Sequence, residues 1–408
     1  DNLPAPIKMA NPDGWSHMPD TSPDAQDMKT EAAASVRHRT GILPSQAIRA
    51  LIKSGEIAAD VEILDDQIQP ASLDLRLGGV AYRVQASFLP GPHDSVADKL
   101  TKLGLHQLDL SDSAVLEKGC VYVVPLMERL ALGAGVSGIA NPKSSTGRLD
   151  IFTRLITDNG VEFDRVRGEY HGPLYAEISP RTFSVIVRAG SRLSQLRLKR
   201  GNFAYSDRAL HRLNEKEQLI DSEPDPAIIK EGIPFTVDLQ GDPATGLVGF
   251  RARKHAGLID IDQKNHYDPH AFWEPIYREA APELILNPDD FYILASREAV
   301  TVPPDHAAEM VAYDTLVGEF RVHYAGFFDP GFGDEGTGGE GSRAVLEVRS
   351  HDVPFLITDS QILGRLVYER LTQKPDRIYG ADIGSTYQRQ GLKLGKQFTP
   401  WKQSTARP

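Results

Sequence analysis

The chain has 408 residues, of which 40% are hydrophobic and 25% are charged, a composition typical of folded globular proteins. This length predicts about two to three domains, and the sequence lacks the run of about 18 apolar residues that a membrane helix needs. The formal net charge of −11 argues against a protein that coats a nucleic-acid polymer, although a local nucleotide site stays compatible with it. The single cysteine, Cys120, excludes an intrachain disulfide and a multi-cysteine zinc site, and we expect a cytoplasmic protein.

The chain begins with a proline-rich polar stretch and then changes to regular patterns. Apolar residues at helical spacing within 48–52 predict a helix that Ser45 caps and Gly55 ends. The segment 72–77 alternates polar and apolar residues, as a half-buried strand does. Further short strands are expected at 121–124 and 183–187. The pattern as a whole predicts a mainly β protein with few short helices.

The sequence repeats itself at a spacing of 170 residues. Tyr122 and Tyr292 lie in similar segments, and Glu177 and Glu347 lie in a second similar pair at the same spacing. Two more pairs are 194–196 with 364–366, also at 170, and 70–75 with 234–239, at 164. Because these similarities occur in order and at nearly constant spacing, they predict two copies of one β-rich unit.

The repeat predicts a division of the chain into four parts. We expect a flexible arm at 1–40, a first β unit at 41–210, a linker at 211–230 and a second β unit at 231–400. The last part of the second unit, from Tyr379 onward, mixes aromatic, amide and basic residues with glycines. Such a tail can close over a charged ligand, and a frayed C-terminus is the alternative.

A compact polar segment at 141–148 contains a lysine, two serines, a glycine and an arginine. Hydroxyls and turn N–H groups donate hydrogen bonds to phosphate oxygens, and the cations neutralise the phosphate charge. The residue order of a Walker A loop is absent. From these residues alone, an ordinary polar turn remains the alternative.

Two further segments, 159–164 and 325–331, each contain a glycine followed within a few residues by an aspartate. Glycine lets a flat ring approach the backbone, and aspartate can accept a hydrogen bond from a sugar hydroxyl. A plain hairpin turn explains the same residues. Glu177 and Glu347 lie in mid-strand between apolar neighbours, where a carboxylate facing a cleft can act as a general base and one facing solvent has no special role.

In combination and in order, these segments resemble the dCTP deaminases, a family related to the trimeric dUTPases. The segment 69–78 after the early helix is similar to that family's opening, and 143–148 is similar to its phosphate motif. The segments 325–332 and 345–347 resemble its base-binding hairpin and catalytic strand, and 379–391 resembles its closing tail. The resemblance implies two tandem dUTPase-like units, each a distorted β-barrel or jelly roll.

The resemblance also implies an activity and a set of site residues. The activity is hydrolytic deamination of dCTP to dUTP and ammonia, with a glutamate as general base, no zinc and no organic cofactor, and Mg²⁺ bound through the substrate triphosphate. Zinc-dependent deamination is excluded independently, since its cysteine motif is absent. The implied residues are Glu347 and Glu177 for catalysis; Ala325, Gly326, Phe328, Asp329 and Asp164 for the base and sugar; and Lys143, Ser144, Ser145, Arg148, Tyr379 and Gln390 for the phosphates.

The two copies have diverged in complementary ways. The first keeps the serine pair of the phosphate motif, which the second lacks at 311–316, while the second keeps the better hairpin and tail. Because sites of the family form between subunits, we expect a composite site in which the first copy holds phosphates and the second holds the base and activates water. Two stacked trimers of like copies, which pair Glu177 with Lys143, are the alternative. Either arrangement is a homo-oligomer, and dTTP is a candidate inhibitor.

Two other functions fit the same residues. The segment 159–164 is similar to the hairpin in which dUTPases hold their water-activating aspartate. A dUTP pyrophosphatase, or a bifunctional enzyme that acts on both dCTP and dUTP, is therefore the first alternative. A non-catalytic nucleotide-binding regulator with one degenerate copy is the second.

Overall fold

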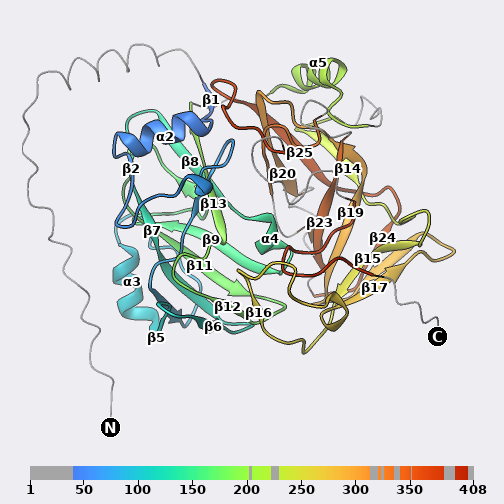
Figure 1. Cartoon of the computed structure of the whole chain (residues 1–408), viewed down its shortest axis with the longest axis horizontal. Helices are drawn as coiled ribbons and strands as arrows, with labels where there is room; N and C mark the ends of the chain where they lie inside the picture. Colours follow the sequence, from blue (N-terminus) through green and yellow to red (C-terminus); the bar gives the residue numbers. More distant parts are fainter. Residues whose placement is uncertain are drawn as a thin grey trace, which may run out of the picture.

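The computed structural model describes residues 40–201, 205–221, 229–312, 320–322, 326–334, 341–350, 352–380 and 391–402. In these ranges the protein is mainly β, as predicted, and its sheets form two sets that lie next to each other (Figure 1). One set comes from the N-terminal half of the chain and the other from the C-terminal half. None of the helices in the described part is long and apolar enough to cross a membrane.

The predicted early helix is α2 (Ser45–Lys53), which buries Ile48 and Leu51 on one face. Gly55 follows it with a φ of +80°, a conformation that favours glycine at a helix end. The prediction that Ser45 caps this helix is wrong, because Pro44 occupies the N-cap position. The Ser45 hydroxyl instead contacts the Asp376 carboxylate. The other helical segments are η1 (Asp65–Gln67), α3 (Val96–Leu103), α4 (Ser144–Gly147), α5 (Asp207–Glu217) and η3 (Pro269–Ala271).

The N-terminal half forms two large antiparallel sheets and part of a third. One has the order β1-β13-β8-β10 with β3 beside β13, the next has the order β5-β4-β7-β11-β9 with β2 beside β7, and β6 and β12 join the third. The strands are β1 (Gly41–Ile42), β2 (Ile57–Ala59), β3 (Leu73–Leu75), β4 (Val80–Val84), β5 (Gly104–Asp109), β6 (Ala114–Leu116), β7 (Val121–Ala131), β8 (Val136–Pro142), β9 (Ile151–Thr157), β10 (Arg165–Val166), β11 (His171–Pro180), β12 (Val185–Val187) and β13 (Ser194–Arg200).

The C-terminal half repeats this arrangement with the orders β14-β25-β20-β22, β17-β15-β19-β23-β21 and β18-β24. Its strands are β14 (Ile233–Thr236), β15 (Leu247–Ala252), β16 (Ile259–Asp260), β17 (Trp273–Tyr277), β18 (Glu283–Leu286), β19 (Phe291–Val300), β20 (His306–Ala312), β21 (Phe320–Val322), β22 (Phe327–Phe328), β23 (Ser342–Ser350), β24 (Phe355–Thr358) and β25 (Ile362–Arg370).

The register of the strands repeats together with their order. Tyr122 pairs with Ile178 between β7 and β11, and Tyr292 pairs with Val348 between β19 and β23, so both partners are 170 positions apart. Each tyrosine hydroxyl accepts a hydrogen bond from the backbone N–H five positions earlier, at 3.1 and 3.0 Å. The predicted duplication of one β unit is confirmed.

The two halves are packed against each other through a shared apolar core. The ring of Phe183, from the N-terminal half, lies 5.8 Å from that of Phe272 and 5.5 Å from that of Trp273. Nearby, β12 pairs in parallel with β16, and Arg188 forms an ion pair of 2.6 Å with Asp260. These contacts fix the relative position of segments that are far apart in the sequence.

Candidate functional site

A cavity of about 420 Å³ lies at the boundary between the two halves. The N-terminal half contributes the 143–148 segment, and the C-terminal half contributes the 326–329 hairpin and Glu347. Its lining residues are Asp66, Gln69, Asp74, Pro142, Lys143, Ser144, Ser145, Arg148, Gly190, Arg192, Gln195, Asp262, Lys264, Met310, Gly326, Phe327, Phe328, Asp329, Phe332, Val345, Glu347, Tyr379 and Lys396. The structure therefore brings the candidate phosphate motif of one copy together with the candidate base-binding hairpin of the other.

The 143–148 segment forms the short helix α4 and its two flanking residues at the end of β8. The backbone N–H of Lys143 and the hydroxyl of Thr146 both donate to the carbonyl of Leu193, at 2.9 and 2.8 Å. These two bonds hold the turn against the neighbouring segment, so that Ser144 and Ser145 remain at the cavity wall.

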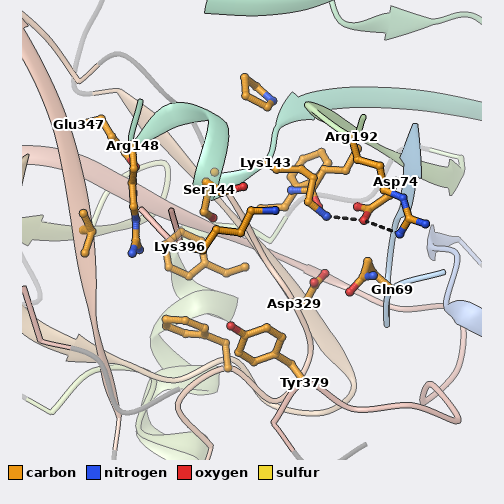
Figure 2. A pocket seen from close by; sticks show the side chains of 18 of the residues that line it. Gln69, Asp74, Lys143, Ser144, Arg148, Arg192, Asp329, Glu347, Tyr379 and Lys396 are labelled. Carbon is orange, nitrogen blue, oxygen red and sulfur yellow. Dashed lines mark hydrogen bonds and ion pairs between the residues drawn. The ribbon is translucent and has the colours of Figure 1, made fainter. Parts of the chain in front are cut away.

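Glu347 lies in the middle of β23 and is only 5% exposed. The Nε atom of Arg148, a residue of the N-terminal half, lies 3.9 Å from its Oε1 atom (Figure 2). Burial raises the pKa of Glu347 to about 7, against the attraction of the Arg148 guanidinium, which lowers it. A carboxyl group with a pKa near neutrality can both accept and return a proton.

A second ion pair between the halves lies two residues from the first. Asp150 contacts Arg349, and the Thr182 hydroxyl donates to Asp150 at 2.6 Å. The guanidinium of Arg349 also donates to Thr182 at 2.9 Å and to the Asp289 carbonyl at 2.7 Å. Because Glu347 and Arg349 are on the same face of β23, this pair fixes the position of Glu347 against the N-terminal half.

Asp329 follows the short strand β22 of the predicted hairpin. The Nη2 atom of the buried Arg197, from β13 of the N-terminal half, lies 3.7 Å from its Oδ1 atom. The same guanidinium stacks 3.9 Å from the ring centroid of Phe327 and donates to the Ala308 carbonyl at 3.1 Å. Burial raises the pKa of Asp329 to about 6, although Arg197 opposes this shift. Arg197 thus holds the hairpin in place from the other half.

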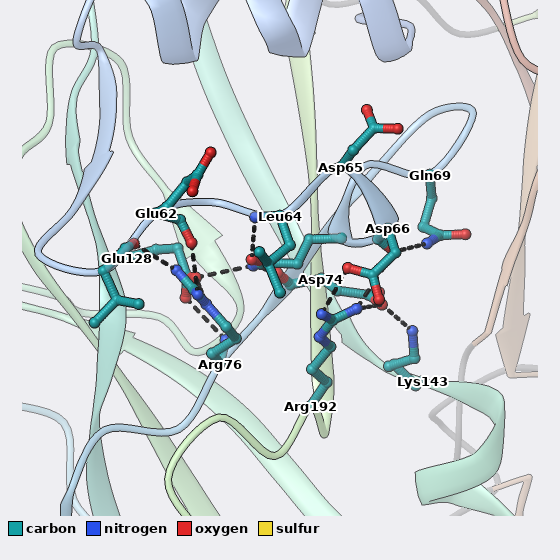
Figure 3. Close-up of polar contacts among 12 residues, drawn as sticks. Glu62, Leu64, Asp65, Asp66, Gln69, Asp74, Arg76, Glu128, Lys143 and Arg192 are labelled. Atoms are coloured by element: carbon teal, nitrogen blue, oxygen red, sulfur yellow. Dashed lines mark hydrogen bonds and ion pairs between the residues drawn. The ribbon is translucent and has the colours of Figure 1, made fainter.

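Asp74 is at the opposite end of the view from Glu347 (Figure 2). It is buried and contacts the Lys143 ammonium, while Arg192 lies 3.9 Å from it and forms an ion pair of 2.8 Å with Asp66 (Figure 3). Two residues further along the chain, Arg76 forms a buried ion pair of 2.7 Å with Glu128. This pair anchors the chain segment that carries Asp74.

Sequence reasoning missed the cavity positions of Asp74 and Arg192, and it missed the contact of Arg197 with Asp329. Asp74 lies in the repeated segment 70–75 and in the segment 69–78 that resembles the family's opening, but neither signal assigns it to a site. Arg192 and Arg197 belong to no motif, and their partners are far away in the sequence. Local sequence patterns do not reveal contacts between residues that are far apart in the chain.

Glu177 and Asp164, the first-copy candidates, are not among the residues that line the cavity. Glu177 is 2% exposed and accepts a hydrogen bond of 3.1 Å from Arg154, whose guanidinium lies 3.5 Å from the ring centroid of Phe163. Asp164 accepts the backbone N–H of Leu155 at 2.7 Å, and burial raises its pKa to about 7. The first-copy glutamate is therefore paired within its own half.

Two other candidates, Ala325 and Gln390, lie outside the described residues. Gly326, Phe328 and Tyr379 do line the cavity. The Tyr379 backbone N–H donates to the Pro330 carbonyl at 3.0 Å, and its ring centroid lies 5.8 Å from that of Phe332. The described start of the tail is thus attached to the hairpin.

The fold and the cavity define a protein of two like β units with a composite polar cavity between them. The family model described as "2'-deoxycytidine 5'-triphosphate deaminase (DCD) N-terminal domain" matches residues 39–202, and the model described as the C-terminal domain matches residues 206–398. The chain belongs to the dCTP deaminase family, as the sequence resemblance predicted. The limits expected for the two units, at 210 and 231, stay predictions.

Individual relatives agree with the family match. The "dCTP deaminase, dUMP-forming" of Halobacterium salinarum is 36% identical over 162 residues, which are 38% of this chain and 78% of the relative. The "dCTP deaminase" of Haloarcula marismortui is 28% identical over 44% of this chain and 87% of the relative. A crystal structure of 2'-deoxycytidine 5'-triphosphate deaminase from Agrobacterium tumefaciens is similar with a TM-score of 0.79 and 56% identity, over 82% of this chain and all of that chain.

Proposed function

We propose that the protein deaminates dCTP hydrolytically to dUTP and ammonia at one composite site between its halves. The observation that carries the proposal is that Ser144, Arg148 and Glu347 line the same cavity, although the first two come from one half and the third from the other. Family membership and the names of the relatives support dCTP as the substrate.

Glu347 is the general base in this proposal. As a carboxylate it removes a proton from water, which attacks C4 of the cytosine ring, and the resulting acid protonates N3 and then assists the departure of ammonia. Because its pKa is near 7, Glu347 can both accept a proton from water and return it to the substrate. Arg148 stabilises the carboxylate form by its positive charge at 3.9 Å.

The other lining residues bind the rest of the nucleotide. Lys143, Ser144 and Ser145 bind phosphate oxygens, with Arg148 as a further cation. Asp329 accepts a hydrogen bond from the deoxyribose, and Gly326 and Phe328 contact the base. Tyr379 belongs to the tail that closes over the phosphates, and Ala325 and Gln390 keep the roles that the resemblance implies. We assign no substrate contact to Glu177 and Asp164, because the described structure pairs them within the first half.

In this proposal Mg²⁺ is bound by the substrate and not by a site on the protein. Among the described residues no group of three or more His, Cys, Asp or Glu side chains is arranged to hold a metal ion. The cavity carboxylate of Asp74 is already paired with Lys143. We therefore expect Mg²⁺ to bind to the triphosphate oxygens and to offset their charge, with no step of the deamination assigned to it.

A bifunctional enzyme that converts dCTP to dUMP is the second candidate. It is favoured by the name of the Halobacterium relative, "dUMP-forming", at 36% identity. The two candidates share the deamination step and differ in whether the phosphate chain is also cleaved.

Product analysis of the full chain, incubated with Mg²⁺ and either dCTP or dUTP, tests the proposal. Ammonia together with dUTP supports the deaminase, whereas ammonia with dUMP and pyrophosphate supports the bifunctional enzyme. Turnover of dUTP without any turnover of dCTP would show a dUTP pyrophosphatase, and tight binding without turnover would show a regulator. Either of the last two results contradicts the proposal.

Three further properties stay predictions. We expect a homo-oligomer, a trimer or two stacked rings, which sedimentation of the purified chain measures. Inhibition by dTTP can be measured in the same deamination assay. A cytoplasmic location rests on the single cysteine and is checked by fractionation of cells.

A further inference from the structure

Lys396 lines the cavity although it was not among the phosphate-binding candidates, because it follows the family-like segment 379–391 that supplied Tyr379 and Gln390. It belongs to the C-terminal segment 391–402, and its side chain is half-buried. Figure 2 shows this side chain between Arg148 and Lys143, beside Ser144. Its ammonium group therefore shares the cavity with the residues to which we assign the phosphates.

The backbone on both sides of Lys396 is held in place. The N–H of Asn265 donates to the Lys396 carbonyl at 2.9 Å, and the buried amide of Gln397 donates to the Ile261 carbonyl at 2.9 Å. The ring of Phe398 packs 5.4 Å from that of Phe272. Lys396 thus extends from a fixed point, as a residue with a defined binding role must.

Lys396 has no ion-pair partner among the described residues. The neighbouring carboxylates are engaged elsewhere, since Asp74 contacts Lys143 and Asp262 forms an ion pair of 2.7 Å with Arg188. Burial lowers the pKa of Lys396, and the charge of Lys143 lowers it further. Two adjacent lysines, one of them without a counterion, favour binding of an anion that contacts both.

We propose that Lys396 is a phosphate-binding residue that favours nucleoside triphosphates over monophosphates at this site. The inference rests on the proposed function, which supplies the deoxycytidine nucleotide. The ammonium group offers three N–H donors to phosphate oxygens. A ligand with one phosphate carries less charge and fewer acceptors, so it gains less from Lys396 than a triphosphate does.

The experiment compares Lys396→Met with the unchanged chain, using dCTP and dCMP as ligands. Methionine keeps an unbranched side chain of similar bulk and removes the charge. Calorimetry measures both affinities, and a deamination assay measures KM and kcat with dCTP. Lys402→Met is the matched control, because Lys402 is an exposed lysine of the same segment and does not line the cavity.

We expect Lys396→Met to weaken dCTP binding and raise its KM by about 10- to 100-fold, the range for loss of one charged hydrogen bond, with a small change in kcat. Binding of dCMP should change much less, and Lys396→Arg should restore most of the preference. An unchanged ratio of dCTP to dCMP affinity overturns the inference. Absence of turnover by the unchanged chain would contradict the proposed function alone, since the affinity ratio still decides the role of Lys396.

Discussion

Asp150 of the N-terminal half and Arg349 of the C-terminal half form a buried ion pair two residues away from Arg148 and Glu347. The two pairs have opposite polarity, because the first half supplies the acid in one and the base in the other. One pair fixes the boundary and the adjacent pair lines the cavity. The position of the proposed general base therefore depends on an interface contact that touches no substrate.

The first prediction concerns this interface. Asp150→Ala removes one partner of a buried pair and leaves the Arg349 charge uncompensated, which lowers the free energy of unfolding by about 3–5 kcal/mol. Deamination should fall as well, because β23 loses an anchor. Denaturant unfolding measures the first effect. Asp60→Ala breaks the exposed pair with Arg129 and serves as the control, with an expected change below about 1 kcal/mol.

The second prediction separates the two glutamates. Glu347→Gln should lower kcat for dCTP by about 10²- to 10⁴-fold, the usual contribution of a general base. Glu177→Gln should leave kcat within a few-fold of normal and lower stability, since Glu177 is paired with Arg154. Steady-state assays check both variants. The opposite result, with activity lost only in Glu177→Gln, would move the catalytic site to the first copy.

The third prediction is the pH dependence of deamination. A general base acts as the carboxylate, so kcat/KM should rise with pH through about pH 7, the pKa of Glu347. Arg148 lowers that pKa, so Arg148→Met should shift the rise to higher pH, and Arg148→Lys should shift it less. A pH profile of kcat/KM measures the shift. A rise at the same pH in all three proteins would show that another group controls it.

The fourth prediction links the same carboxyl groups to stability. Folding raises the pKa of Glu347 to about 7 and of Asp329 to about 6, so the folded protein binds more protons than the unfolded chain between about pH 4 and pH 7. The two carboxyl groups contribute their full stabilisation below their pKa values in the unfolded chain. This stabilisation is lost as pH rises through their folded pKa values of about 6 and 7. Unfolding measured from pH 5 to 8 should show this loss.

The double variant Glu347→Gln with Asp329→Asn provides the comparison for this fourth prediction. The glutamine and asparagine introduced at these two positions do not titrate. The free energy of unfolding of the double variant, compared with that of the unchanged protein, should therefore increase as pH rises. A constant difference between the two proteins across this range would contradict the raised pKa values.

Part of the fold could be predicted because its signals are local or repeat in order. The helix near 45–53 follows from apolar spacing, and the duplication follows from similarities such as Tyr122 with Tyr292. The role of Ser45 could not be predicted, because its contact with Asp376 joins residues 331 positions apart. Such contacts form only when the two halves of the chain pack against each other.

The sequence by itself determined the family, the mainly β duplicated fold and several of the residues that line the cavity, because each motif is a short run of neighbouring residues. Only the tertiary structure decided which motifs share a cavity. It placed the candidate phosphate motif of the first copy with Glu347 of the second, and it paired Glu177 with Arg154 instead. The reason is physical: charge, burial and pKa depend on side chains that packing brings together, and their separation along the chain does not reveal them.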